Sequence, residues 1–285
     1  MDSIHFDLTY TPLPHLGSKW VTAISTRLLA YGVVPDQIFM NLTVPNMISV
    51  EMIDDILVGM DQHPVGVSVE VAEIAPSRNY LSATIIGTGI QEKRSLLIRN
   101  QSGKGELLCV TGDVGGAMAG LRILLREKKY WDPEGGEPFK PDLSGYEHVI
   151  GKQLLPTTRL DLFNAMRDNE IVPGSMIDLS QGLINDLQVM GKESSCGFNI
   201  YSPAIPIDLA TRKVADEMQE DVDRYALYGG EDHELLFTLR EGDVEKLRAS
   251  FEDFTVIGDV TDRKNEIVVN DGEGGSVDPS TGRQE

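Results

Sequence analysis

Alternating apolar and polar positions divide the first part of the chain into a predicted strand and a predicted helix. The segment NLTVPNMISVEMIDDILVGM (41–60) predicts a strand, a turn at Pro45–Asn46 and then a helix. Ser49 is a suitable N-cap for this helix, because its hydroxyl can accept a hydrogen bond from a free backbone N–H group of the first turn. The helix is expected to bury one apolar stripe, formed by Val50, Ile53, Ile56, Leu57 and Met60.

Further apolar runs predict that strands and helices alternate through the middle of the chain. NYLSATIIGTG (79–89) is rich in β-branched residues, ends in glycine and predicts a strand. GELLCVTGDVGGAMAGLRILLREKKYW (105–131) predicts a strand, a glycine-rich turn and a helix. Its basic residues gather near the helix C-terminus, where the helix dipole favours them. TTRLDLFNAMRD (157–168) predicts a short amphipathic helix.

The C-terminal part repeats this pattern before it ends in a polar tail. SMIDLSQGLINDLQVMGKES (175–194) predicts a strand followed by a helix. One face of that helix carries three apolar residues, Leu183, Leu187 and Met190. FTVIGDVT (254–261) and EIVVNDG (266–272) predict a closing hairpin. The last residues, 271–285, have little apolar surface to bury and are expected to be disordered.

The alternation of strands and helices predicts a mixed fold of the α/β (α+β) class. At 285 residues and 41% hydrophobic, the chain can bury one large core or two modest ones, and two domains are expected. The best break lies in RNQSGKGE, which gives an N-terminal domain over 1–105 and a C-terminal domain over 106–270.

The charge and the cysteine content of the chain limit which partners and which metal sites are expected. The net charge is −20, which would repel nucleic-acid phosphates and anionic membranes, so neither is expected as a partner. An alternative explanation of the acidity is a strongly hydrated surface suited to a salty cytoplasm. The two cysteines, Cys109 and Cys196, form no CxxC or Cys/His cluster, so neither zinc ligation nor a disulfide framework is expected. No charged leader and no bilayer-length apolar run occur, so a reduced, cytoplasmic protein is expected.

The glycine-rich turn TGDVGGAMAGL (111–121) allows two interpretations. Free backbone N–H groups at the start of the following helix could bind a phosphate group. However, no Lys-Ser or Lys-Thr follows the glycines, and Asp113 would oppose an anion. The alternative is that the glycines only allow close packing between helix and strand.

Two further segments could carry chemistry. In IDLSQGL (177–183), Asp178 ends an apolar strand and Ser180 stands where a helix N-cap belongs, so they could hold magnesium beside a phosphate or serve as ordinary capping residues. In ALYGGEDHELLFTL (226–239), three acids and a histidine crowd the start of a strand. This acidic segment is either solvated or holds a cation or a hydrogen-bond donor. Three histidines show no metal-ligand spacing: His5, His15 and His233.

The order of four motifs resembles the thiamine-monophosphate kinases, a family of the aminoimidazole-ribonucleotide-synthetase-like superfamily. These motifs are HFDLTYTPLPHLG, VTGDVGGAMAGL, IDLSQGL and YGGEDHELLFT, and the resemblance runs from residue 3 to about residue 270. It implies a two-domain fold whose N-terminal sheet pairs across a homodimer, with the active site between the domains. It also implies phosphorylation of thiamine phosphate to thiamine diphosphate, with ATP as co-substrate and Mg²⁺ as cofactor.

The resemblance also implies roles for six residues, and it assigns no catalytic residue. Substrate binding falls on His5, Glu231 and the adjacent Asp232, and metal binding falls on Asp178. Nucleotide binding falls on Arg99 and Ser180.

Several positions depart from the family pattern. Arg27, Val71 and Gln181 stand where metal-binding aspartates are expected. The chain also starts after the family's Gly-Asp-Asp-Ala segment and Thr-Asp pair, and it has Gly282–Arg283 near an expected Gly-Trp. Two unit charges about 4 Å apart interact by roughly 4 kcal/mol at an effective dielectric constant near 20, so an arginine in place of an aspartate turns attraction for a metal into repulsion.

Three functions therefore remain open. The first is an active thiamine-phosphate kinase. The second is a catalytically impaired paralogue that binds nucleotide or thiamine phosphate without transferring a phosphoryl group. The third is a folded protein without a ligand.

Overall fold

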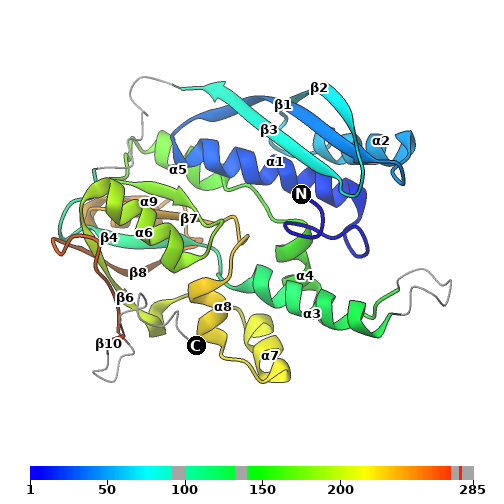
Figure 1. Ribbon diagram of the computed structural model, residues 1–285. Coiled ribbons are helices and arrows are strands. Elements are labelled where there is room, and N and C mark those ends of the chain that lie inside the picture. The colour runs from blue at the N-terminus through cyan, green and yellow to red at the C-terminus, as the bar shows by residue number, and fades with distance from the viewer. Residues whose placement is uncertain (92–100, 132–139, 271–275, 278–285) are drawn as a thin grey trace.

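The computed structural model describes residues 1–91, 101–131, 140–270 and 276–277, and Figure 1 shows their arrangement. The strands form two separate sheets, one of three strands in the order β2-β1-β3 and one of seven strands in the order β10-β9-β6-β8-β4-β7-β5. Helices pack against both sheets, which confirms the predicted mixed α/β class.

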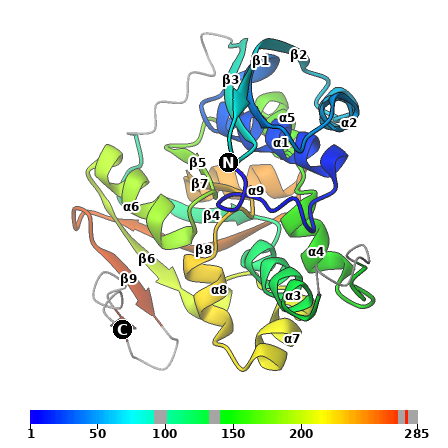
Figure 2. The same cartoon turned by 45° about the vertical axis from the view of Figure 1, so that its right-hand side comes forward.

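The three-stranded sheet is built around β1 (Val34–Pro45). β2 (Ser68–Ser77) pairs with it in parallel and β3 (Ser82–Ile90) pairs with it antiparallel. α1 (Leu13–Ala30) and α2 (Val50–Asp61) cover one face of this sheet, and α1 lies between it and the rest of the molecule (Figures 1 and 2). The residues of β1 that point toward the helices are almost completely buried: Ile38, Met40 and Leu42.

Two glycines allow α1 and α2 to cross with their backbones in contact. A Cβ atom on Gly17 would lie 2.0 Å from the carbonyl oxygen of Ile56, and a Cβ atom on Gly59 would lie 1.9 Å from that of Pro14. Both distances are far below van der Waals contact, so any side chain at either position would force the helices apart.

The N-terminal predictions are confirmed in part. The hydroxyl of Ser49 caps α2 by accepting a hydrogen bond from the backbone N–H of Met52 at 3.4 Å. The predicted stripe was wrong at Val50, which is 69% exposed. Successive helical residues turn by about 100°, which places Val50 at the margin of the face that buries Ile56 and Met60. Neither α1 nor β2 was predicted.

The seven-stranded sheet contains the remaining strands. They are β4 (Leu107–Thr111), β5 (Met176–Asp178), β6 (Gly197–Tyr201), β7 (Leu235–Leu239), β8 (Phe254–Thr261), β9 (Ile267–Asn270) and β10 (Ser276–Val277). The helices of this part are α3 (Gly116–Tyr130), α4 (Glu147–Leu154), α5 (Leu160–Asp168), α6 (Leu183–Ser194), α7 (Leu209–Met218), α8 (Val222–Tyr228) and α9 (Glu241–Arg248), with a short 3₁₀ turn at Ser202–Ala204.

The predicted hairpin of β8 and β9 was wrong. β6 lies between them, antiparallel to β8 and parallel to β9. Both edges of β6 are hydrogen-bonded, so β6 is an inner strand of the sheet, and the apolar side chains of Phe198 and Ile200 are fully buried. The predicted disorder of the tail was wrong at Ser276–Val277, which form β10 beside β9. The other residues of that prediction, 271–275 and 278–285, lie outside the described residues.

The strands on either side of the predicted domain break fall into different sheets. β3 ends at Ile90 and β4 begins at Leu107. The division of the chain at residues 105 and 106 itself stays a prediction. In the part of the chain that the structure describes, no helix combines the length and the apolar character needed to cross a bilayer.

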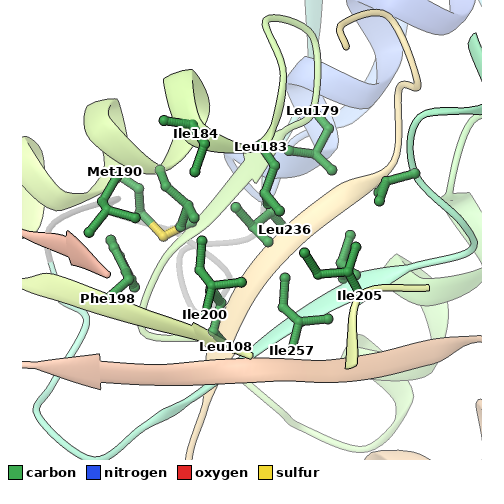
Figure 3. Close-up of a cluster of buried hydrophobic side chains, with 14 of the residues drawn as sticks. Leu108, Leu179, Leu183, Ile184, Met190, Phe198, Ile200, Ile205, Leu236 and Ile257 are labelled. Carbon is green, nitrogen blue, oxygen red and sulfur yellow. The ribbon is translucent and has the colours of Figure 1, made fainter. Parts of the chain in front are cut away.

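A buried apolar cluster fixes α6 on the seven-stranded sheet (Figure 3). The helix contributes Leu183, Leu187 and Met190, as predicted, and each of them is at most 1% exposed. The cluster's other members include Leu108, Leu179, Phe198, Ile200, Ile205, Leu236 and Ile257. Because Leu179 and Leu236 belong to it, the cluster also fixes the end of β5 and the start of β7, where the candidate site lies.

Candidate active site

Two loops run side by side where β5 ends and β7 begins. The strands are antiparallel neighbours, and backbone hydrogen bonds continue their pairing into the loops. The N–H of Leu179 donates to the carbonyl oxygen of Glu234 at 2.8 Å, and the N–H of His233 donates to that of Leu179 at 2.9 Å. The N–H of Glu231 donates to the carbonyl oxygen of Ser180 at 3.2 Å. The predicted acidic segment therefore lies beside Asp178 and Ser180.

Glu231 is paired with a cation from α1. Its Oε2 atom lies 2.6 Å from Nζ of Lys19, which also donates to the carbonyl oxygen of Gln153 at 2.7 Å. The Lys19 side chain is 9% exposed and that of Glu231 is 30% exposed. Burial alone would raise the pKa of Glu231, but the charge and hydrogen bond of Lys19 outweigh it and hold the pKa below its ordinary value.

Asp232 lies beneath the site and caps α3. Its two carboxylate oxygens accept hydrogen bonds from the backbone N–H groups of Gly115, at 2.8 Å, and Ala117, at 2.9 Å. Burial raises the pKa of Asp232 to about 7, against the effect of these two donors. The glycine-rich turn thus already holds an internal carboxylate, which favours its packing interpretation over phosphate binding.

Glu234 is the centre of a buried polar network. It accepts a hydrogen bond from the Thr111 hydroxyl at 2.5 Å, and its oxygens lie 2.6 Å from Nζ of Lys152 and 3.3 Å from Nη1 of Arg159. These ionic side chains are 15% exposed or less. The network ties α4 and the start of α5 to the strand that carries the acidic segment.

Asp178 is paired with a second cation from α1. Nη2 of Arg27 lies 3.4 Å from Oδ2 of Asp178 and 3.3 Å from the hydroxyl oxygen of Ser180.

Ser180 was predicted as an N-cap, but α6 begins after Gly182 and has no side-chain cap. The carboxylate of Asp186 accepts from the N–H groups of Ser180 and Gln181 instead, at 3.0 and 2.9 Å, so the cap interaction runs backward from inside the helix. Burial raises the pKa of Asp186 to about 6.

The predicted substrate residues His5 and Glu231 line one pocket of about 310 Å³. The pocket is bounded by the N-terminal arm, by α3 and by the acidic segment, and its walls also include Asp7, Tyr10, Met118 and Gln153. Burial and the nearby acids raise the pKa of Tyr10 to about 12, so its hydroxyl stays neutral. Of the other predicted site residues, Asp178 and Ser180 lie on the adjoining loop, and Arg99 lies outside the described residues.

His233 is held neutral between the two ion pairs. It is 5% exposed, and its Nδ1 atom has no hydrogen-bond partner in the described part of the chain. Burial, followed by the charge of Lys19, lowers its pKa to about 4.

Because of this lowered pKa, His233 should make the protein less stable in acid. An unfolded histidine takes up a proton near pH 6.5, so between that value and pH 4 the unfolded chain binds more protons and stability falls as the pH falls. The stability advantage of the wild type over His233→Asn should therefore shrink by about 2 kcal/mol between pH 8 and pH 5. Asparagine tolerates the positive φ of 53° at this position. Urea unfolding at several pH values measures the difference, and a difference independent of pH would contradict the assignment.

No family model matches the chain. Several thiamine-monophosphate kinases, however, are similar to it in sequence. The thiamine-monophosphate kinase of Buchnera aphidicola subsp. Acyrthosiphon pisum is 28% identical over 92% of this chain and 77% of its own length. That of Escherichia coli K12 is 33% identical over 71% of this chain and 59% of its own length. The chain is thus similar in sequence to the thiamine-monophosphate kinases.

Solved structures agree in fold. The thiamine-monophosphate kinase of Aquifex aeolicus superposes with a TM-score of 0.78 at 22% identity, covering 97% of this chain and 86% of the other. A complex named AaThiL with AMPPCP and TMP gives the same TM-score over 94% and 80% of the two chains, at 22% identity. The hydrogenase maturation protein HypE of E. coli gives 0.73 at 16% identity, over 95% and 81%. These likenesses confirm the aminoimidazole-ribonucleotide-synthetase-like fold.

Among the described residues, the side chains around Asp178 do not form a set of magnesium ligands. Within the described ranges, no three His, Cys, Asp or Glu side chains lie close enough together to hold a metal ion. The carboxylate of Asp178 faces the guanidinium of Arg27, and that of Asp186 faces backbone N–H groups. Magnesium prefers near-octahedral oxygen coordination, which this set does not fit.

The sequence alone assigned no role in the candidate site to Lys19, Lys152 and Arg159. One available signal was the crowding of acids in YGGEDHELLFT, because buried like charges require cations from elsewhere in the fold. A second was the spacing of Lys19 and Arg27, which places two cations about two turns apart on one helix.

Proposed function

We propose that the protein phosphorylates thiamine phosphate to thiamine diphosphate with ATP as co-substrate. The observation that carries this proposal is the pocket that joins His5 to Glu231, two of the three residues to which the resemblance assigns substrate binding. The family's kinases are its sequence relatives, and a neighbour in fold is a complex with AMPPCP and TMP. ATP is found in the cytoplasm, so a cytoplasmic location is part of the proposal.

The pocket suits the cationic ring system of thiamine phosphate. Its thiazolium ring carries a positive charge, and Glu231 and Asp7 place two carboxylates in the pocket wall. Lys19 engages Oε2 of Glu231, whereas Oε1 has no hydrogen-bond partner among the described residues and can face the substrate. Asp232 is left out of the substrate contacts, because both of its oxygens bind the end of α3.

Phosphoryl transfer requires that two anions be placed end to end. A phosphate oxygen of thiamine phosphate attacks the γ-phosphorus of ATP, and the bond from that phosphorus to the bridging oxygen breaks as ADP leaves. The chain's own residues contribute position and charge to this step. Ser180, on the loop beside the pocket, is proposed to contact the nucleotide, and Arg99 keeps its proposed role there. The described residues do not fit a magnesium site.

The protein is also proposed to form a homodimer through the open face of the three-stranded sheet. Phe39 and Ile86 are paired across β1 and β3 on the face that α1 and α2 leave uncovered, and Ile86 is 59% exposed. An exposed apolar centre on a sheet favours burial against a second copy. Sedimentation velocity of the full chain tests this, because a monomer at micromolar concentration would contradict it.

A second candidate function is binding without phosphoryl transfer. The ion pair between Arg27 and Asp178 supports it, because a guanidinium stands beside the carboxylate to which the resemblance assigns a metal ion. In this case the protein would bind ATP or thiamine phosphate and release no ADP.

The first test is formation of thiamine diphosphate from thiamine phosphate and ATP, with an intact relative assayed alongside. The proposed function predicts product, and Glu231→Gln should raise the KM for thiamine phosphate about tenfold, which corresponds to roughly 1.4 kcal/mol of lost cation binding. The matched control is Glu266→Gln, which removes an acid paired on the surface with Arg263 and should leave KM unchanged. Binding of both ligands without product would favour the second candidate.

A further inference from the structure

We propose that Arg27 is the phosphate-binding cation of this site, anchored by Asp178, and that phosphate compounds bind there without a divalent metal ion. The inference rests on the proposed function only for the place of the site. In this proposal the guanidinium of Arg27 neutralises the phosphate charge, so phosphate binding does not depend on magnesium.

The first support is the geometry of the guanidinium. Arg27 lies in the last turn of α1, and its single Nη2 atom reaches both Asp178 and Ser180. A guanidinium carries five N–H donors, and Nη2 has two of them. In the described ranges no partner is present for Nη1 or Nε, and the side chain is 53% exposed. Three donors therefore remain, and Nη1 and Nε can each donate a single charge-assisted hydrogen bond to a phosphate oxygen.

The second support is the imbalance of the ion pair. The Asp178 side chain is 3% exposed, and its contact with Arg27 is a single one of 3.4 Å. A pair made only for stability usually brings two parallel hydrogen bonds of about 2.8 Å. Here the buried carboxylate holds one corner of the guanidinium and leaves the rest facing outward. This is how an anchored cation would be oriented toward a ligand.

The third support is competition for the aspartate. A magnesium ion bound to Asp178 would stand beside the guanidinium, and two cations about 4 Å apart repel. Arg27 and a metal ion are therefore alternatives at this carboxylate. The guanidinium is covalently attached and always charged, so it competes with a metal ion for this carboxylate.

The fourth support is the layout along α1. Lys19 and Arg27 are eight residues apart, which corresponds to about 12 Å along a helix. Lys19 contacts Glu231 in the pocket wall, and Arg27 contacts the loop at Asp178 and Ser180. An extended ligand with a cationic ring at one end and a phosphate at the other matches this order of charges.

The test is calorimetric titration of the full chain with ATP and with inorganic pyrophosphate, in EDTA and again with magnesium chloride. The wild type should bind ATP in EDTA with a Kd within about threefold of that in magnesium, and Arg27→Gln should weaken binding at least tenfold in both buffers. Arg167→Gln is the matched control, because it removes an exposed arginine paired with Asp168 and should leave the Kd unchanged.

A second variant, Arg27→Asp, distinguishes phosphate binding by a guanidinium from phosphate binding through a metal ion. It places a carboxylate beside Asp178, so ATP binding should become dependent on magnesium. Melting curves of both variants show whether they are folded. A wild type that binds ATP only with magnesium, or an unchanged Kd in Arg27→Gln, would overturn the inference. ATP binding through Arg27 without formation of thiamine diphosphate would overturn the proposed function alone.

Discussion

Replacing Glu234 by glutamine is expected to lower the free energy of unfolding by about 3–5 kcal/mol, the usual cost of breaking a buried ion pair from one side. Glutamine keeps the shape of the side chain and removes its charge. Lys152 and Arg159 would then lose the carboxylate on which both converge at 2.6 and 3.3 Å. Their remaining acidic partners include Asp113, Asp161 and Asp253, of which the last two are more than half exposed.

Urea unfolding at pH 7 measures this loss. The control is Glu266→Gln, whose carboxylate pairs with Arg263 on the surface at 2.8 Å. Exposed pairs contribute about 0–1 kcal/mol, so the control should be nearly neutral. If both variants lose the same small amount, the network around Glu234 is not the buried centre described above.

Replacing Gly17 by alanine is the second large effect, with an expected loss of about 2–3 kcal/mol from overpacking. The added methyl group would overlap the carbonyl oxygen of Ile56, which is backbone and cannot rotate away. α1 and α2 must therefore separate, and the cluster formed by Leu16, Ile56 and Met60 would lose contact.

Gly151→Ala is a matched control for this substitution. Gly151 also lies within a helix, and a Cβ atom there would meet no atom within 4 Å. Alanine is favoured over glycine in a helix by about 1 kcal/mol, so this variant should be equally or more stable than the wild type. Thermal unfolding of the two variants side by side decides the matter, and equal midpoints would contradict the close crossing of α1 and α2.

The local pattern was sufficient for most of the seven-stranded sheet but not for α1. Strands such as β4 and β7 are continuous apolar runs, and α6 shows a regular apolar face. The buried side of α1 includes Gly17, Lys19, Thr22, Ser25 and Thr26, so burial and polarity do not coincide along this helix. The hairpin failed for a different reason. Which strand lies between β8 and β9 depends on long-range pairing, and no local signal encodes it.

In the candidate site, too, some residues could be predicted from the sequence and others could not. The acids and Ser180 could be found because they lie in short motifs, and the resemblance to a family ordered those motifs. Their partners could not, since Lys19 is 212 residues away from Glu231 and Arg27 is 151 residues away from Asp178. The same long separation explains why the sequence assigned a metal to Asp178, where the fold places a guanidinium.

The position of α1 has a consequence for how this chain can change over generations. Helix α1 belongs to the unit of the three-stranded sheet, yet its two cations balance acids that the other sheet supplies. A mutation that removes charge at position 231 or 178 leaves a cation behind on α1, and the reverse change leaves a carboxylate. Descendants of this sequence should therefore exchange positions 19 and 231, and positions 27 and 178, as pairs. Recombination that joins its first unit to the second unit of another relative would separate these pairs.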